Sequence, residues 1–121
     1  MKTLRVGIAS YEEIKARTMD IVRGKHKPAK DEPSVWFASA ESFAKVLSDK
    51  NRALLDLIVE TEPESIAELA EKTGRKKSNL SRTLHTMENY GLVVLKKVAK
   101  GRVIPRVPYS NIALVMPIGT V

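Results

Sequence analysis

The chain has 121 residues, with 21 Lys and Arg against 14 Asp and Glu, which gives a formal net charge of +7. It has no cysteine, and this excludes thiolate zinc sites, disulfide scaffolds and cysteine nucleophiles. Its apolar runs are far shorter than the ~20 residues of a membrane span. The N-terminal segment lacks the apolar region of a signal peptide, so we expect a soluble, cytoplasmic protein with no membrane partner.

The positive charge is confined to one window of the chain. Residues 1–74 carry 12 Lys and Arg against 13 Asp and Glu, and residues 107–121 carry no charged side chain. Residues 75–106 carry nine bases against the single acid Glu88, a net charge of +8. The preceding stretch, residues 49–74, has three bases against seven acids. This polarity predicts one surface that meets a polyanion and another that faces away from it.

The first 22 residues predict a strand followed by a helix. Apolar residues alternate with other residues over the opening segment, at Leu4, Val6 and Ile8. Ser10 is followed three residues later by Glu13, which is the spacing of a capping box at a helix start. We therefore expect a helix over residues 11–22.

The segment after this helix predicts a linker. Residues 23–34 contain two prolines, one glycine and dense charge, which leaves little to pack. We expect residues 1–34 to form an N-terminal strand–helix extension with its linker, and residues 35–121 to form the main domain. Trp36, the only tryptophan, is expected to anchor the N-terminal junction. The alternative is a ligand-sensing pocket between residues 36–60 and a dimer partner.

The main domain begins with a short strand and two helices. Residues 35–38 are apolar and indicate a strand that could pair with residues 3–8. A helix follows this strand. The next helix begins at Ser48 or Asp49 and ends before Pro63, because the residue before a proline is pushed out of the helical conformation.

A short helix and a longer one come next, separated by a glycine turn. The short helix spans residues 66–72, is opened by a second capping box at Ser65, and ends at Gly74, which suits a left-handed conformation. The longer helix spans roughly residues 76–89 and has one buried stripe, formed by Leu80, Leu84 and Met87.

A hairpin and a last strand complete the predicted elements. Residues 92–95 and 102–104 indicate two strands with Lys100–Gly101 as the turn, and residues 112–116 indicate one more. The predicted fold class is α+β, mostly α. It is a winged helix-turn-helix with a β-hairpin wing, preceded by the small N-terminal strand–helix extension.

This order of elements fits double-stranded DNA, because a major groove about 12 Å wide admits one α-helix. The short helix would brace the longer one and leave its polar side chains free for base edges. The predicted DNA contacts of this recognition helix are Lys76, Lys77, Ser78, Asn79, Ser81, Arg82 and His85. The predicted contacts of the wing, with phosphates or the minor groove, are Lys96, Lys97, Lys100 and Arg102.

Several of these residues also have a plainer interpretation, and His85 could be an ordinary exposed histidine. Lys76 and Lys77 could be an ordinary solvated helix start, and Asn79 could be a cap or a solvated side chain. Arg82 could pair with Glu88 or with the acids of residues 64–71. No metal-spaced cluster, phosphate loop or catalytic triad is apparent, so we expect no enzymatic activity, no metal and no cofactor.

The run SIAELAEKTGRKKSNLSRTLHTMENYGLVVLKKVAKGR, residues 65–102, resembles the winged helix-turn-helix of MarR-like prokaryotic transcriptional regulators. It is similar in particular to a small group of predicted archaeal and bacterial regulators, over residues 36–106. The resemblance implies a dimer on a pseudo-palindromic site, and an antitoxin role for some members. The sequence departs from the pattern at Lys76, where such proteins often have Ser or Thr as N-cap. Either Ser78 caps one turn later, or the backbone amides are left for phosphate.

The sequence therefore predicts a dimeric, sequence-specific DNA-binding regulator, most simply a repressor. Residues 1–47 and 110–118 are expected to form the homodimer contact, because they present unpaired apolar strands. One alternative is an antitoxin or protein-interaction module whose basic window binds an acidic partner such as a toxin. A binder of structured RNA ranks last, because Tyr90 is the only aromatic residue in the basic window.

Overall fold

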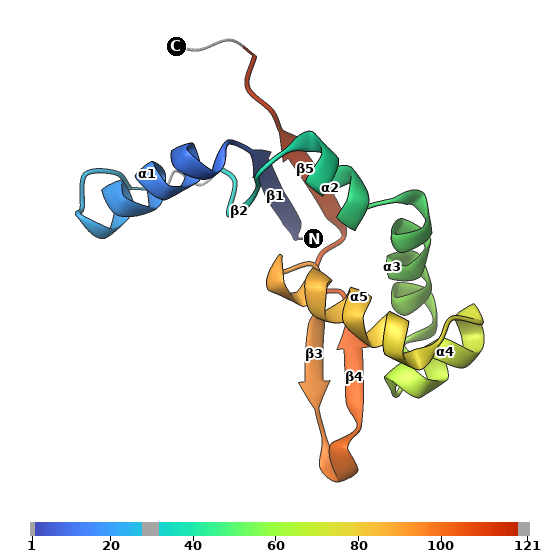
Figure 1. Ribbon diagram of the computed structural model, residues 1–121. Coiled ribbons are helices and arrows are strands. Elements are labelled where there is room, and N and C mark those ends of the chain that lie inside the picture. Colours follow the sequence, from blue (N-terminus) through green and yellow to red (C-terminus); the bar gives the residue numbers. More distant parts are fainter. Residues whose placement is uncertain (1, 28–31, 119–121) are drawn as a thin grey trace. The chain divides into compact units, whose positions relative to one another are not determined.

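The structure, a computed structural model, describes residues 2–27 and 32–118 (Figure 1). Residues 28–31 of the expected linker, and residues 1 and 119–121 at the chain ends, lie outside the described residues. The elements in chain order are β1 Thr3–Ile8, α1 Tyr11–Val22, β2 Val35–Phe37, α2 Ala40–Val46, α3 Asp49–Thr61, α4 Ile66–Thr73, α5 Lys77–Asn89, β3 Val94–Lys97, the 3-10 turn η1 Ala99–Gly101, β4 Val103–Arg106 and β5 Asn111–Val115. The α+β fold class with a hairpin after the last helix is confirmed.

These elements group into two compact units. One comprises the described residues up to Lys45 together with those from Asn111 onward, and the other comprises Val46–Ser110. The grouping differs from the boundary expected at residue 34, because strands from both ends of the chain pair in one sheet. Local patterns do not reveal which distant strands pair, so the sequence could not indicate that the last strand returns to the first.

The first unit is built on a parallel sheet with the strand order β2-β1-β5. β1 pairs with β2 at Val6↔Val35, as expected, and with β5 from Thr3↔Asn111 to Gly7↔Val115. The core-facing residues of the central strand, Leu4 and Val6, are only 2% and 0% exposed. The central strand therefore holds together segments more than 100 residues apart.

α1 starts where the sequence predicts. Ser10 Oγ accepts a hydrogen bond from the Glu13 N–H at 3.1 Å, and the Glu13 carboxylate accepts one from the Ser10 N–H. Farther along, the Arg17 guanidinium lies 5.2 Å from the centre of the Trp36 ring. Arg17 also pairs with Glu32, whose carboxylate accepts a second hydrogen bond from His26 Nε2. This cluster fastens the described parts of the loop between α1 and β2.

The second unit contains three helices and a hairpin in the described residues (Figure 1). The N-cap of α3 is Ser48, whose Oγ accepts from the Asn51 N–H, and its C-cap is Glu62, with φ of 44°, just before Pro63. The N-cap of α4 is Ser65, whose Oγ accepts from the Glu68 N–H at 3.0 Å. The second capping box is only half correct, because the Glu68 carboxylate bonds the N–H of residue 64 and not that of residue 65.

The core of this unit is the predicted apolar stripe and the residues that meet it. Leu80, Leu84 and Met87 are 0–1% exposed, which confirms the stripe on α5. They are buried together with Leu54, Ile58, Ile66, Leu69, Leu92 and Val93. Among the described residues, no helix has the length and apolar character to cross a membrane.

Gly7→Ala tests the packing of the first unit. The Trp36 ring lies against this glycine, and an added Cβ would fall 2.5 Å from Trp36 Cζ3. We expect a destabilisation of about 1–3 kcal/mol from overpacking, measured by urea unfolding followed through circular dichroism. Adding Trp36→Leu should relieve most of the penalty in a double-mutant cycle. Equal penalties with and without the indole would contradict this contact.

Candidate nucleic-acid interface

The turn between α4 and α5 sets the direction of the candidate recognition helix. The C-cap of α4 is Gly74, whose φ of 71° is the left-handed conformation that glycine adopts without steric cost. The Gly74 N–H donates to the Ala70 carbonyl oxygen at 2.9 Å and closes α4. α5 begins three residues later at Lys77, with the apolar stripe turned to the core. Its opposite face is therefore presented outward.

The start of α5 shows how the helix begins after Lys76, where related proteins often have Ser or Thr as N-cap. Lys76 is the N-cap, with φ −64° and ψ 136°, and within the described residues no side chain bonds the first-turn amides. Ser78 lies inside the helix, so the expectation that it caps one turn later is wrong. An uncapped helix N-terminus carries unsatisfied N–H donors and a partial positive charge, which favour an anion such as a phosphate. Lys76 and Lys77 are both exposed beside these donors.

The outward face of α5 carries the predicted base-reading side chains. Ser78, Asn79, Arg82 and His85 are exposed, and Ser81 is half-buried. Within the part of the chain that the structure describes, Arg82 pairs with no carboxylate, so the alternative salt bridges to Glu88 or to residues 64–71 are not formed. The guanidinium thus projects from the helix with its donors available.

His85 is held against its own helix. Its Nδ1 lies 2.7 Å from the Ser81 carbonyl oxygen. Because a carbonyl oxygen can only accept, Nδ1 carries the proton in this contact, and in the neutral ring Nε2 is left as an acceptor. An acceptor at this position can take a hydrogen bond from a base amino group or a water molecule.

The wing is an antiparallel hairpin of β3 and β4, paired from Val94↔Arg106 to Lys97↔Val103. Figure 1 shows it projecting away from the helices of its unit, with the turn at its far end. The predicted strand at residues 92–95 starts two residues too early, because the Leu92 N–H donates to the Met87 carbonyl oxygen of α5 and pairing with β4 begins only at Val94. Leu92 and Val93, each 2% exposed, are core residues before the strand. The turn has left-handed φ values of 65° at Lys100 and 72° at Gly101.

The cations of the wing do not all lie in one place. Lys96, Lys97, Lys100 and Arg102 are all exposed. Lys96 and Lys97 are consecutive residues of β3, and consecutive strand residues point to opposite faces. Only one of these two lysines can therefore lie on the face of the hairpin that contacts a given DNA strand. Arg102 pairs with Glu64, with 3.3 Å between Nη1 and Oε2.

Two other arginines of the basic window serve the fold. Arg106 Nη1 donates to the Pro63 carbonyl oxygen at 2.7 Å, and Nη2 donates to the Glu62 carbonyl oxygen at 3.3 Å. These bonds satisfy carbonyls at the end of α3 and tie the base of the wing to the α3–α4 loop. Arg75 donates to Asn51 Oδ1 and Thr83 Oγ1, and so bridges α3 and α5.

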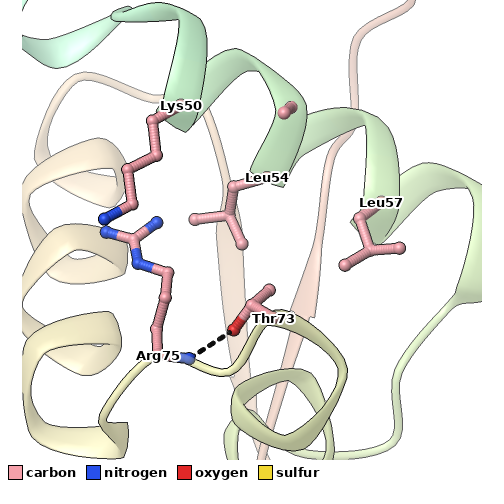
Figure 2. Close-up of a pocket in the computed structure, with 6 residues that line it drawn as sticks. Lys50, Leu54, Leu57, Thr73 and Arg75 are labelled. Atoms are coloured by element: carbon pink, nitrogen blue, oxygen red, sulfur yellow. Dashed lines mark hydrogen bonds between the residues drawn. The ribbon is translucent and has the colours of Figure 1, made fainter.

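Arg75 also lines a shallow hollow of about 230 Å³ against α3 (Figure 2). The floor is apolar, with Leu54 and Leu57, and the charged ends of Lys50 and Arg75 point toward one another at the rim. No acid is among the residues that line it. Lys50 is not among the predicted site residues, because it stands in a stretch that is acidic overall. Among the described residues, no group of three or more His, Cys, Asp or Glu could hold a metal ion.

A family model describes the region that contains this geometry. The model HVO_A0114 matches residues 46–114, which is more than half of the chain. The chain belongs to the HVO_A0114 family. The match spans all of the second unit and most of β5, so the helix-turn-helix and the wing lie inside the family region.

Two further comparisons complete the picture. The fold is similar to a crystal structure described as "the predicted DNA-binding transcriptional regulator from E. coli", at 18% identity and a TM-score of 0.48. The alignment covers 84% of this chain and 86% of the other. No curated protein matches the sequence.

Separate replacement of Arg106 and Arg102 tests which arginine of this HVO_A0114 family member stabilises the fold and which is free for an interface. Arg106→Ala should destabilise the second unit by about 1–3 kcal/mol, because it leaves carbonyls without a charged donor. Arg102→Ala removes an exposed ion pair and should cost less than about 1 kcal/mol. Urea unfolding gives both values, and amide hydrogen exchange over β3 and β4 should be faster in Arg106→Ala alone. Equal effects of the two changes would contradict the division.

Proposed function

We propose that the protein is a sequence-specific, double-stranded DNA-binding transcriptional regulator that acts through α5 and the β3–β4 wing. The observation that carries the proposal is the outward face of α5. It combines a helix N-terminus without a side-chain cap, flanked by Lys76 and Lys77, with an Arg82 that pairs with no carboxylate among the described residues. Lysine side chains without acidic partners at a helix start are suited to contact the phosphate backbone of DNA. A projecting arginine is suited to bind the edge of a guanine base.

Each part of this surface has a distinct role in the proposed complex. α5 lies in the major groove, where Arg82 and Asn79 read base edges and Ser78, Ser81 and His85 make the shorter contacts. Lys76 and Lys77, with the first amides of the helix, hold a phosphate. Lys100 at the wing tip, with Lys96 or Lys97, reaches the adjacent backbone or minor groove. Arg102 would exchange its partner Glu64 for a phosphate.

The proposed regulator works as a homodimer and as a repressor in the cytoplasm. A two-fold dimer places two recognition helices on successive major grooves, one helical turn of DNA apart, and this matches a pseudo-palindromic operator. A protein bound there excludes other proteins from the same DNA. The resemblance to MarR-like regulators supports this mode of action.

A gel shift with salt titration tests sequence-specific binding. The protein should bind DNA from upstream of its own gene more tightly than random DNA of equal length, and the difference should persist as salt rises. Phosphate contacts weaken with salt for both DNAs alike, whereas base contacts survive. If both DNAs bind equally at every salt concentration, the proposal of a specific regulator is wrong.

Two single substitutions separate the proposed roles of α5 and the wing. Arg82→Ala should lose about 1–3 kcal/mol of discrimination between operator and random DNA. Lys100→Ala should weaken binding to both DNAs alike and reduce the slope of log K against log salt by about one. Both side chains are exposed, so neither change should unfold the protein. If Arg82→Ala also weakens binding to both DNAs by the same factor, as Lys100→Ala is expected to do, the assignment of separate roles is wrong.

A further inference from the structure

The outer edge of β5 is the feature that the proposed DNA contacts leave unused. β5 is the last strand in the order β2-β1-β5, so in the described part of the chain one of its edges pairs with β1 and the other with no strand. Such an edge presents a row of backbone N–H and C=O groups to any chain that can pair with it. β2, at the opposite edge, is only three residues long.

Except for Asn111 at its start, the side chains of β5 are apolar on both faces of the sheet. Ile112 and Leu114 lie on one face and are 38% and 39% exposed, and Val115 on the other face is 39% exposed. Met116, directly after the strand, is 50% exposed. The whole segment from residue 107 to residue 121 carries no charge, in a chain in which 29% of residues are charged.

An unpaired edge strand with exposed apolar side chains and no charge is unusual for a strand that stays exposed to solvent. Proteins protect exposed edge strands with lysine, proline, bulges or inward charges, and parallel sheets are normally covered on both faces. β5 has none of these charges, and Pro117 stands after the strand and not in it. The edge is therefore equipped to be covered by another strand.

We propose that β5 pairs antiparallel with β5 of a second copy of this chain and joins the two sheets into one continuous sheet. Pairing along the full strand about a two-fold axis sets Ala113 opposite Ala113. It also sets Ile112 opposite Leu114 of the second copy, with their side chains on one face. The inference rests on the proposed function in that it locates the homodimer contact of the proposed regulator.

A second copy fits this edge better than other occupants. A nucleic acid requires cations, and residues 107–121 have none. A two-fold contact requires a surface complementary to itself, and an uncharged apolar strand meets that condition in the antiparallel direction. Main-chain hydrogen bonds would give affinity, and the apolar pairs would fix the register.

Paired charges at residues 112 and 114 test the contact. Ile112→Glu and Leu114→Lys each place two charges opposite apolar side chains in the dimer, so each variant alone should dimerise at least about tenfold more weakly. An equimolar mixture should recover a heterodimer, because the carboxylate introduced in one chain then faces the ammonium group introduced in the other. Sedimentation velocity over a concentration series measures all three. Val22→Glu, at a residue 75% exposed on α1, is the matched control and should dimerise as the wild type does.

The outcomes separate this inference from the proposed function. If the wild type and both variants dimerise equally, or if the mixture of variants forms no heterodimer, the proposed β5 contact is wrong. The gel shift tests DNA binding independently of this result. A wild type that stays monomeric at high micromolar concentration overturns the contact and the dimer together. The proposed β5 contact is also wrong if the wild-type protein uses β5 to bind a different protein and does not bind a second copy of itself.

The absence of native cysteine allows a direct check of register. Ala113→Cys places two thiols on the proposed axis, where directly opposed Cα atoms are about 4.5–5.5 Å apart, within reach of a disulfide. After addition of diamide, this variant should form a covalent dimer much faster than Val22→Cys. Equal rates would indicate random collision and contradict the pairing.

Discussion

The helix-turn-helix depends on the burial of one stripe along α5. Leu80, Leu84 and Met87 are almost completely removed from solvent, and this fixes the rotation of the helix about its own axis. The left-handed Gly74 allows α4 and α5 to follow one another closely enough for Ile66 and Leu69 to share that core. Because helical side chains recur every 3.6 residues, the same rotation turns Ser78 and Arg82 outward. The composition of the outward face is free to vary for function, since it contributes little to the core.

The basic side chains of residues 75–106 have different roles in the structure. A net charge of +8 over residues 75–106 suggests a uniform electrostatic surface, yet its arginines behave differently. Arg106 and Arg75 donate to carbonyl, amide and hydroxyl oxygens inside the unit, and Arg102 pairs with Glu64. The lysines of this window and Arg82 have no acid partner among the described residues. Arginine suits the internal role because its planar group can serve two acceptors at once, whereas lysine is a hydrated point charge.

Local signals account for what the sequence predicted well. The caps at Ser10, Ser48 and Ser65 and the stop at Gly74 are read from a few neighbouring residues, and the helices begin and end accordingly. Non-local features were missed. An apolar run such as Leu92–Val93 fits a strand or a core loop equally well, and only the pairing with a second strand, which begins at Val94, decides. The return of β5 to β1, the cluster of His26 and Glu32, and the bridging by Arg75 depend on contacts between distant segments. The residues of the candidate site are exposed in the structure except for the half-buried Ser81, and their roles toward DNA stay predictions.

The two proposed surfaces depend on one another through symmetry. A single helix N-terminus with a few lysines supplies only a few phosphate contacts, and an affinity built on these is weak and strongly reduced by salt. The proposed two-fold dimer would double those contacts, and the spacing of two half-sites on DNA is itself a source of specificity. Charge at the dimer contact would repel a second copy, whereas a lack of charge at the DNA contact would abolish binding. The confinement of all excess charge to residues 75–106, with none after residue 106, meets both requirements in one short chain.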